Sequence, residues 1–260
     1  GLSSSRWILA TLIILPFALP YMRKQWPLIR QHWLIISILG LLGVSLFNTL
    51  LYHAAHTTTS TNISLIQTTM PAMIVLIVWL FFDEKITSRA IAGVLISISG
   101  AMLVVSRGDL AVFLSWDFAP GDMWMLLANF FYGLYSVLMR KLPAIHPMAF
   151  LGSSFLIGTL ILLPLFIWDL QHHPLPEFNQ PFIGSLIYIA LFPSIVSYLA
   201  WNRGVKLIGA SMAGFFICLI PVYTAILASI FLQEQLLWYH FAGMLIILVG
   251  FVLFQHRKAT

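Results

Sequence analysis

Amide and phenol side chains at helical spacing are the groups of this chain best suited to hold a small polar molecule. Asn129 lies near the middle of the apolar segment 122–139, and Tyr132 follows at i+3 on the same face of a helix. Polar side chains inside a membrane are costly unless they face a cavity or a neighbouring helix. We therefore expect Asn129 and Tyr132 to line a substrate pocket. The alternative is that Asn129 anchors two helices by a hydrogen bond.

Two further pairs of Asn and Tyr are related by one constant offset. Asn48 and Tyr52 lie at i and i+4 in the apolar segment 33–53, and 150 residues later the equivalent positions hold Tyr198 and Asn202. The exchanged identities predict two gates, or two rims of one substrate pocket. Simple anchoring of helices is the alternative, because Tyr is common near the ends of membrane spans.

Prolines inside apolar segments predict two bends. Gln67 and Thr68 precede Pro71, and Cys218 precedes Pro221. A proline leaves the carbonyl one turn earlier without its helical donor. We expect both helices to kink there, with Gln67 and Thr68 contacting substrate. Alternatively, hydroxyl groups and neighbouring helices satisfy the freed carbonyls.

Composition places the elements that carry these residues in a lipid bilayer. The chain is 60% hydrophobic and 8% charged, with a mean hydropathy of +0.97, whereas soluble domains have about 25% charged residues. The net charge of +5 does not indicate nucleic-acid binding, because the basic residues occur singly or in pairs between apolar runs. The single cysteine, Cys218, excludes an intrachain disulfide.

Apolar runs of about 20 residues, the length that crosses a bilayer, recur along the chain. They predict an all-α, polytopic membrane helix bundle with nine spans in this chain. The expected spans are 7–22, 33–53, 62–82, 88–106, 122–139, 147–168, 181–201, 209–232 and 237–255.

The basic residues predict the orientation of these spans. Nine spans put eleven Lys and Arg residues on one side and only Arg6 and Arg107 on the other. The basic side of a multi-pass protein is cytoplasmic. We therefore expect the C-terminus to be cytoplasmic in a cell inner (plasma) membrane.

A gapless internal repeat predicts how the spans are related. Residues 39–104 align with 189–254 at the offset of 150, and the basic loop residues of the two copies lie on opposite ends. The coinciding residues are Pro71 with Pro221, Glu84 with Glu234, Gly93 with Gly243, and Gly100 with Gly250. Such an exchange of charge indicates an inverted repeat, which is typical of secondary transporters.

The repeat extends further towards the N-terminus at a slightly different offset. Residues 10–16 match 158–164 at an offset of 148, and the second copy has one more span before that match. We expect two inverted five-helix repeats and ten spans, with the first span preceding this chain. The domains would be an incomplete first repeat (1–106), a loop (107–121) and a second repeat (122–260). A nine-span protein with a shorter first copy is the alternative.

The repeated pattern resembles the EamA-like families of the drug/metabolite transporter superfamily. In each copy a proline-containing span ends in Glu84 or Glu234 and leads into a glycine-spaced span, although Asp83 and Gln233 stand where the family commonly has Gly. The resemblance implies ten helices around a central cavity, alternating access, and export of amino acids or other small metabolites. We expect the two glutamates to be solvated helix-end carboxylates. The glycine-spaced spans are expected to pack closely and are a candidate homodimer contact.

The pocket residues predict the substrate class. No charged residue falls in the middle of a predicted span. Proton coupling through a buried acid is therefore not expected. We expect facilitated export or exchange instead. An uncharged pocket of amides and phenols suits a small zwitterion such as an amino acid. Other neutral metabolites or drugs, a channel, or a structural membrane protein are the alternatives. No HExxH, GxSxG or acidic cluster occurs, so we expect no enzyme, no metal and no cofactor.

Overall fold

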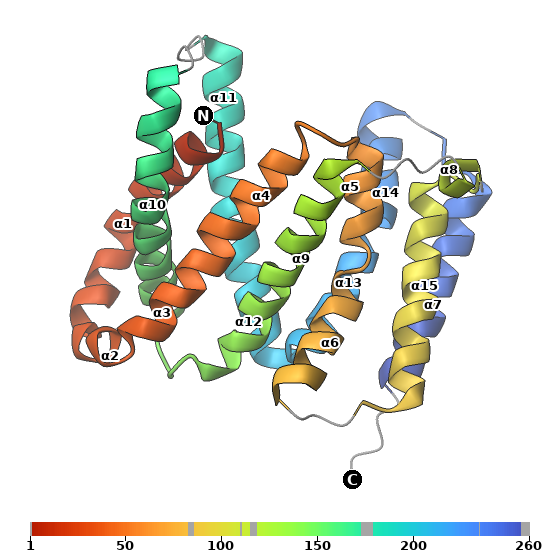
Figure 1. Cartoon of the computed structure of the whole chain (residues 1–260), viewed down its shortest axis with the longest axis horizontal. Coiled ribbons are helices and arrows are strands. Elements are labelled where there is room, and N and C mark those ends of the chain that lie inside the picture. Colours follow the sequence, from red (N-terminus) through yellow and green to blue (C-terminus); the bar gives the residue numbers. More distant parts are fainter. Residues whose placement is uncertain are drawn as a thin grey trace. The chain divides into compact units, whose positions relative to one another are not determined.

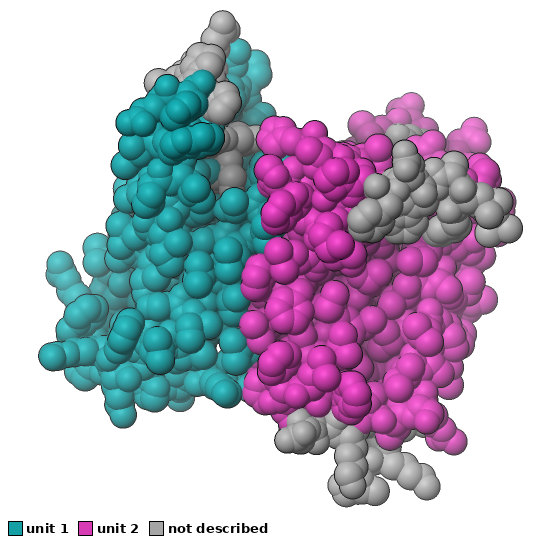
Figure 2. Space-filling view, in the orientation of Figure 1, with its two compact units in different colours: residues 1–52, 138–207 teal, residues 53–137, 208–260 magenta. Residues whose placement is uncertain are grey.

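The computed structural model describes residues 2–82, 86–109, 111–114, 119–172, 179–233 and 235–255, and this part of the chain contains helices and no strand (Figure 1). The predicted all-α class is therefore confirmed. The chain forms two compact units, coloured separately in Figure 2. Unit 1 holds residues 1–52 and 138–207, and unit 2 holds 53–137 and 208–260. Each unit takes helices from both predicted repeats.

Unit 1 is built on close packing between its longest helices. Its elements are α1 (Leu2–Lys24), α2 (Trp26–Gln31), α3 (Trp33–Leu39), η1 (Gly40–Leu46), α4 (Phe47–Ala54), η2 (Met139–Lys141), α10 (Pro147–His172), α11 (Gln180–Ile189), η3 (Ala190–Val196) and α12 (Ser197–Ile208). α1 packs along α10, and α10 also packs against η1. A Cβ on Gly158 would lie 2.5 Å from Cβ of Val44, so glycine is what allows α10 and η1 to approach.

Two π-helical segments, η1 and η3, lie at the offset of 150. In η3, Pro193 cannot donate to the carbonyl of Ile189, and Ser194 Oγ donates to that carbonyl instead at 2.9 Å. In η1, Asn48 Nδ2 donates to the carbonyls of Gly43 and Val44 at 3.0 and 3.1 Å. Side chains thus satisfy carbonyls of both wide turns, and such π-bulges often accompany functional sites.

Unit 2 contains the remaining helices. They are α5 (Ser60–Gln67), α6 (Met70–Phe82), α7 (Ser88–Val105), α8 (Ala111–Leu114), α9 (Pro120–Leu138), α13 (Ala210–Cys218), α14 (Ile220–Leu232) and α15 (Trp238–Gln255). α7 and α15 run side by side along their whole length (Figure 1). A Cβ on Gly93 would lie 2.6 Å from the carbonyl oxygen of Gly250, and one on Gly100 2.7 Å from that of Gly243. The glycine-spaced spans therefore pack against each other.

Two helix pairs in unit 2 are bent at equivalent places. α5 and α6 meet at 42°, and α13 and α14 meet at 41°. Pro71 is the second residue of α6, and Pro221 is the second residue of α14. Both breaks thus lie immediately before a proline, where the first turn of a helix tolerates the missing N–H.

The number of spans is smaller than expected from the sequence. By length and composition, 6 helices of the described chain could cross a membrane, or up to 8 if each bent pair is one span. The helix α9, which corresponds to the expected span 122–139, is not among them. Asp122 and Asn129 lower its hydropathy, and both are fully buried. The nine-span count stays a prediction.

Candidate functional sites

A buried polar cluster in unit 1 is centred on Arg6, whose side chain is 7% exposed. Its Nε donates to Ser194 Oγ at 2.8 Å, and its Nη2 donates to Asn48 Oδ1 at 3.2 Å. Its Nη1 donates to the hydroxyl of Tyr52 at 3.4 Å. The guanidinium therefore connects α1, η3 and α4. We call Arg6, Asn48, Tyr52, Ser194 and Tyr198 the Arg6 cluster.

Tyr198 joins this cluster from α12. Asn48 Nδ2 donates to the Tyr198 hydroxyl at 3.2 Å, and that hydroxyl in turn donates to the carbonyl of Gly43. The Tyr198 ring makes edge-to-face contacts with Trp7 and Phe155, at centroid distances of 5.4 and 5.6 Å. Asn48 and Tyr198, which the sequence related by the offset of 150, are thus in direct contact.

The other two members of these predicted pairs lie nearby on the same helices. Tyr52 is one turn beyond Asn48 in α4, and Asn202 is one turn beyond Tyr198 in α12; both side chains are half-buried. Tyr52 contacts Arg6 as described. All four residues of the two exchanged pairs thus lie in unit 1.

Sequence reasoning missed Arg6, which it assigned to the outer side of the membrane. Thr159 Oγ1 donates to the carbonyl of Trp7 at 3.3 Å, and Thr159 lies half-way along the 26-residue α10. Arg6 is therefore level with the middle of a helix about 39 Å long. The offset of 148 could have indicated this depth, because it aligns Arg6 with Ser154, which lies inside the expected span 147–168.

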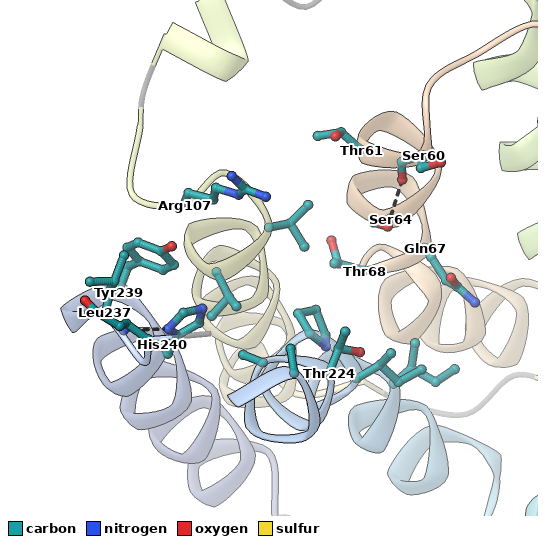
Figure 3. A pocket seen from close by; sticks show the side chains of 18 residues that line it. Ser60, Thr61, Ser64, Gln67, Thr68, Arg107, Thr224, Leu237, Tyr239 and His240 are labelled. Atoms are coloured by element: carbon teal, nitrogen blue, oxygen red, sulfur yellow. Dashed lines mark hydrogen bonds between the residues drawn. The ribbon is translucent and has the colours of Figure 1, made fainter. Parts of the chain in front are cut away.

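Unit 2 contains a cavity of about 630 Å³. It reaches from Arg107 and His240, where α7 ends and α15 begins, to Thr68 and Pro221 at the two helix bends (Figure 3). Its polar lining also includes Ser60, Thr61, Ser64, Gln67, Thr224 and Gln235. Two of the predicted substrate-binding residues, Gln67 and Thr68, thus face this cavity, which offers hydroxyl and amide groups to a small polar ligand.

The carbonyls at the first bend have partners within the protein. Asn129 Nδ2 donates to the carbonyl of Ile66 at 2.8 Å, and Thr69 Oγ1 donates to the same carbonyl at 2.7 Å. Cys218 Sγ lies 3.8 Å from the carbonyl oxygen of Thr68. These contacts match the alternative in which hydroxyls and neighbouring helices satisfy the bend. Asn129 does not line the cavity, and its buried Oδ1 has no partner in the described structure.

Two other residues of α9 differ in their surroundings. Tyr132 is half-buried, with its ring 5.5 Å from that of Tyr135. Asp122, the first residue of the expected span 122–139, is fully buried. It accepts hydrogen bonds from Thr58 Oγ1 at 2.5 Å and from Asn62 Nδ2 at 3.2 Å, which ties the start of α9 to α5 and the loop before it.

Glu84 and Glu234 lie outside the described residues. In the part of the chain that is described, no three His, Cys, Asp or Glu side chains form a group able to hold a metal ion.

Apolar membrane-length helices, two broken helix pairs and a polar cavity are typical of membrane transporters. The model of the EamA-like transporter family matches residues 2–106 and 119–255, and the chain belongs to this family. The family resemblance stated from the sequence is therefore confirmed, as is transport across a membrane as the class of function.

Several transporters are similar to this chain. An uncharacterized transporter of Archaeoglobus fulgidus is 29% identical over 221 residues, which cover 85% of this chain and 75% of the relative. The uncharacterized transporter YyaM of Bacillus subtilis is 26% identical over 218 residues, covering 84% and 70%. A solved structure described only as a crystal structure of a protein superimposes with a TM-score of 0.74 at 16% identity, over 97% of this chain and 85% of that chain. This last likeness shows the fold alone.

Proposed function

We propose that the chain is an inner-membrane secondary carrier that exports small metabolites, above all amino acids, by alternating access. The observation that carries this proposal is the cavity of about 630 Å³ between two broken helix pairs. Carriers bind substrate where helices are interrupted, because the break presents polar backbone at membrane depth and permits hinge motion. The hydroxyl and amide lining suits a small zwitterion.

Contacts between equivalent residues support two inverted repeats. When a two-fold axis relates two copies, residues on the axis touch their own equivalents. Such pairs in the individual units are Thr11 with Thr159 (2.7 Å), Asn48 with Tyr198 (3.2 Å), Thr68 with Cys218 (3.8 Å) and Ser97 with Ile247 (3.2 Å). An axis in the membrane plane would put each pair at mid-depth. We therefore retain nine spans for this chain and ten for the family as part of the proposal.

The predicted substrate-binding residues divide into two roles in this proposal. Gln67 and Thr68 contact substrate, because they face the cavity. Asn129 positions the bend through its bond to Ile66. Tyr132 does not line the cavity, so it makes no substrate contact in this proposal. The residues of the exchanged pairs belong to unit 1, where they lie in or beside the Arg6 cluster; they are Asn48, Tyr52, Tyr198 and Asn202.

The lining of the cavity includes loop and helix-end residues at one end of unit 2, and we infer that the cavity opens there. Arg107 and His240 lie there, at the opposite end of α15 from the C-terminal Gln255. If the C-terminus is cytoplasmic, as the basic residues predict, the cavity faces outward. That is the state from which an exporter releases its substrate.

A homodimer contact would use the exposed apolar faces of α7 and α15, such as Leu95 and Phe241, because the glycine faces of these two helices already pack against each other.

Efflux from bacterial cells tests the proposal. Cells expressing the chain are loaded with a panel of labelled amino acids, and efflux is compared with that of cells carrying an empty vector. We expect saturable efflux of at least one amino acid that Gln67→Leu reduces about fivefold, since one polar contact contributes about 1 kcal/mol. Efflux of other metabolites only would exclude the amino-acid assignment. Flux that does not saturate would favour a channel.

A further inference from the structure

The Arg6 cluster places a positive charge inside unit 1 with only neutral partners. We propose that the Arg6 cluster is a binding site for the carboxylate group of a small organic anion. This site shares no residue with the cavity in unit 2, so the inference goes beyond the proposed function and does not depend on the direction of transport.

The charge of Arg6 is not balanced by the described residues around it. A guanidinium keeps its positive charge in proteins, and its three hydrogen bonds go to the neutral oxygens of Ser194, Asn48 and Tyr52. In the described part of unit 1 the only acid is Asp169, which lies ten residues beyond Thr159 on α10, about 15 Å along the helix. A buried charge without a counter-charge is costly, so an anion bound here would be stabilised.

The ring of Trp7 offers partial compensation. The guanidinium carbon of Arg6 lies 5.0 Å from the centroid of this ring, within the range of a cation–π contact. A ring face attracts a cation but accepts no directed hydrogen bond. The guanidinium has five N–H groups, of which three are engaged by the hydrogen bonds above. Donor capacity for a ligand therefore remains.

One edge of the guanidinium is held less firmly than the others. The bond from Nη1 to Tyr52, at 3.4 Å, is the longest of the three, and Tyr52 is half-buried while Ser194 and Asn48 are buried. A carboxylate arriving at this edge could accept two parallel N–H bonds, the geometry in which Arg binds carboxylates most strongly. The Tyr52 hydroxyl, which accepts from Arg6, could donate its own proton to the same carboxylate.

The rest of the cluster fixes the orientation of the guanidinium. Ser194 Oγ is held by its own bond to the carbonyl of Ile189, and Asn48 is held by the carbonyls of η1. Such preorganisation lowers the entropic cost of binding. The aromatic rings of Trp7, Phe155 and Tyr198 pack beside the cluster, so the apolar part of the ligand must be small.

Binding to the purified chain in detergent micelles tests the site without any transport. The probes are lactate, its neutral amide lactamide, and inorganic phosphate, measured by titration calorimetry. We expect lactate to bind about 10- to 100-fold more tightly than lactamide, as a charge-assisted hydrogen bond predicts. Arg6→Gln should remove this preference, and Arg6→Lys should keep part of it. Arg23→Gln, at the exposed end of the same helix, should leave it unchanged.

Other results would overturn the proposal. Equal affinity of the unaltered protein for lactate and lactamide would do so whether or not any variant folds. Tighter binding of phosphate than of lactate would overturn the carboxylate assignment. If Gln67→Leu removed the preference while Arg6→Gln retained it, the carboxylate would bind in the unit 2 cavity. Because the binding experiment does not measure efflux, a negative result would not affect the carrier proposal, which the efflux experiment tests.

Discussion

Ser194 takes part in two hydrogen bonds of unit 1, one buried and one part-buried. It accepts from Arg6 Nε and donates to the carbonyl that Pro193 cannot satisfy. Ser194→Ala should lower the free energy of unfolding by about 1–3 kcal/mol, because it leaves the buried Nε donor of Arg6 without this partner and removes the bond to the part-buried carbonyl of Ile189. Thermal unfolding in detergent measures the effect. Ser197→Ala is the matched control, because Ser197 makes the same type of bond to Phe192 but is exposed.

Asn129 is a second residue whose contacts define its role. Asn129→Ala removes one of the donors to Ile66 at the first bend. We expect a loss of about 0.5–1.5 kcal/mol in stability, because Thr69 still donates to that carbonyl. Thermal unfolding and efflux should therefore decline together. Full stability combined with lost efflux would instead support a direct contact between Asn129 and substrate, as the sequence suggested.

Among the elements, the sequence predicts the apolar helices in part and the positions of both bends. Both follow from local chemistry: the length of an apolar run, and the missing N–H of Pro71 and Pro221. The π-helical segments were not predicted, because they depend on tertiary partners such as Asn48. The depth of Arg6 in the membrane was missed for a related reason. It follows only from the position of α1 along α10, which is a tertiary contact.

The pairing of α7 with α15 depends on having no side chain at four glycine positions. A Cβ on Gly250 would lie 2.3 Å from Ser97 Oγ and 2.5 Å from the carbonyl oxygen of Gly93. Gly250→Val should separate the helices and lower stability by at least about 1–3 kcal/mol. The yield of folded protein in size-exclusion chromatography is the measurement. Gly184→Val on α11, with nothing within 4 Å of its Cβ, should give the normal yield.

The whole molecule must expose its cavity to one side of the membrane at a time if it is a carrier. Cys218, the single cysteine, is fully buried, so the natural chain should resist a membrane-impermeant thiol reagent. Thr224→Cys introduces an exposed thiol into the cavity wall. Because the cavity opens at the end of unit 2 away from Gln255, Thr224→Cys should be labelled from outside intact cells.

Ser88→Cys supplies the opposite control for sidedness. Ser88 is the exposed first residue of α7, and the predicted orientation puts it on the cytoplasmic side with Arg89. It should therefore react in inside-out vesicles and stay unlabelled in intact cells. Labelling of Ser88→Cys from outside, with Thr224→Cys labelled only in inside-out vesicles, would show that the orientation is inverted. If a transported amino acid slows the labelling of Thr224→Cys and leaves Ser88→Cys unchanged, the cavity is occupied by substrate during transport.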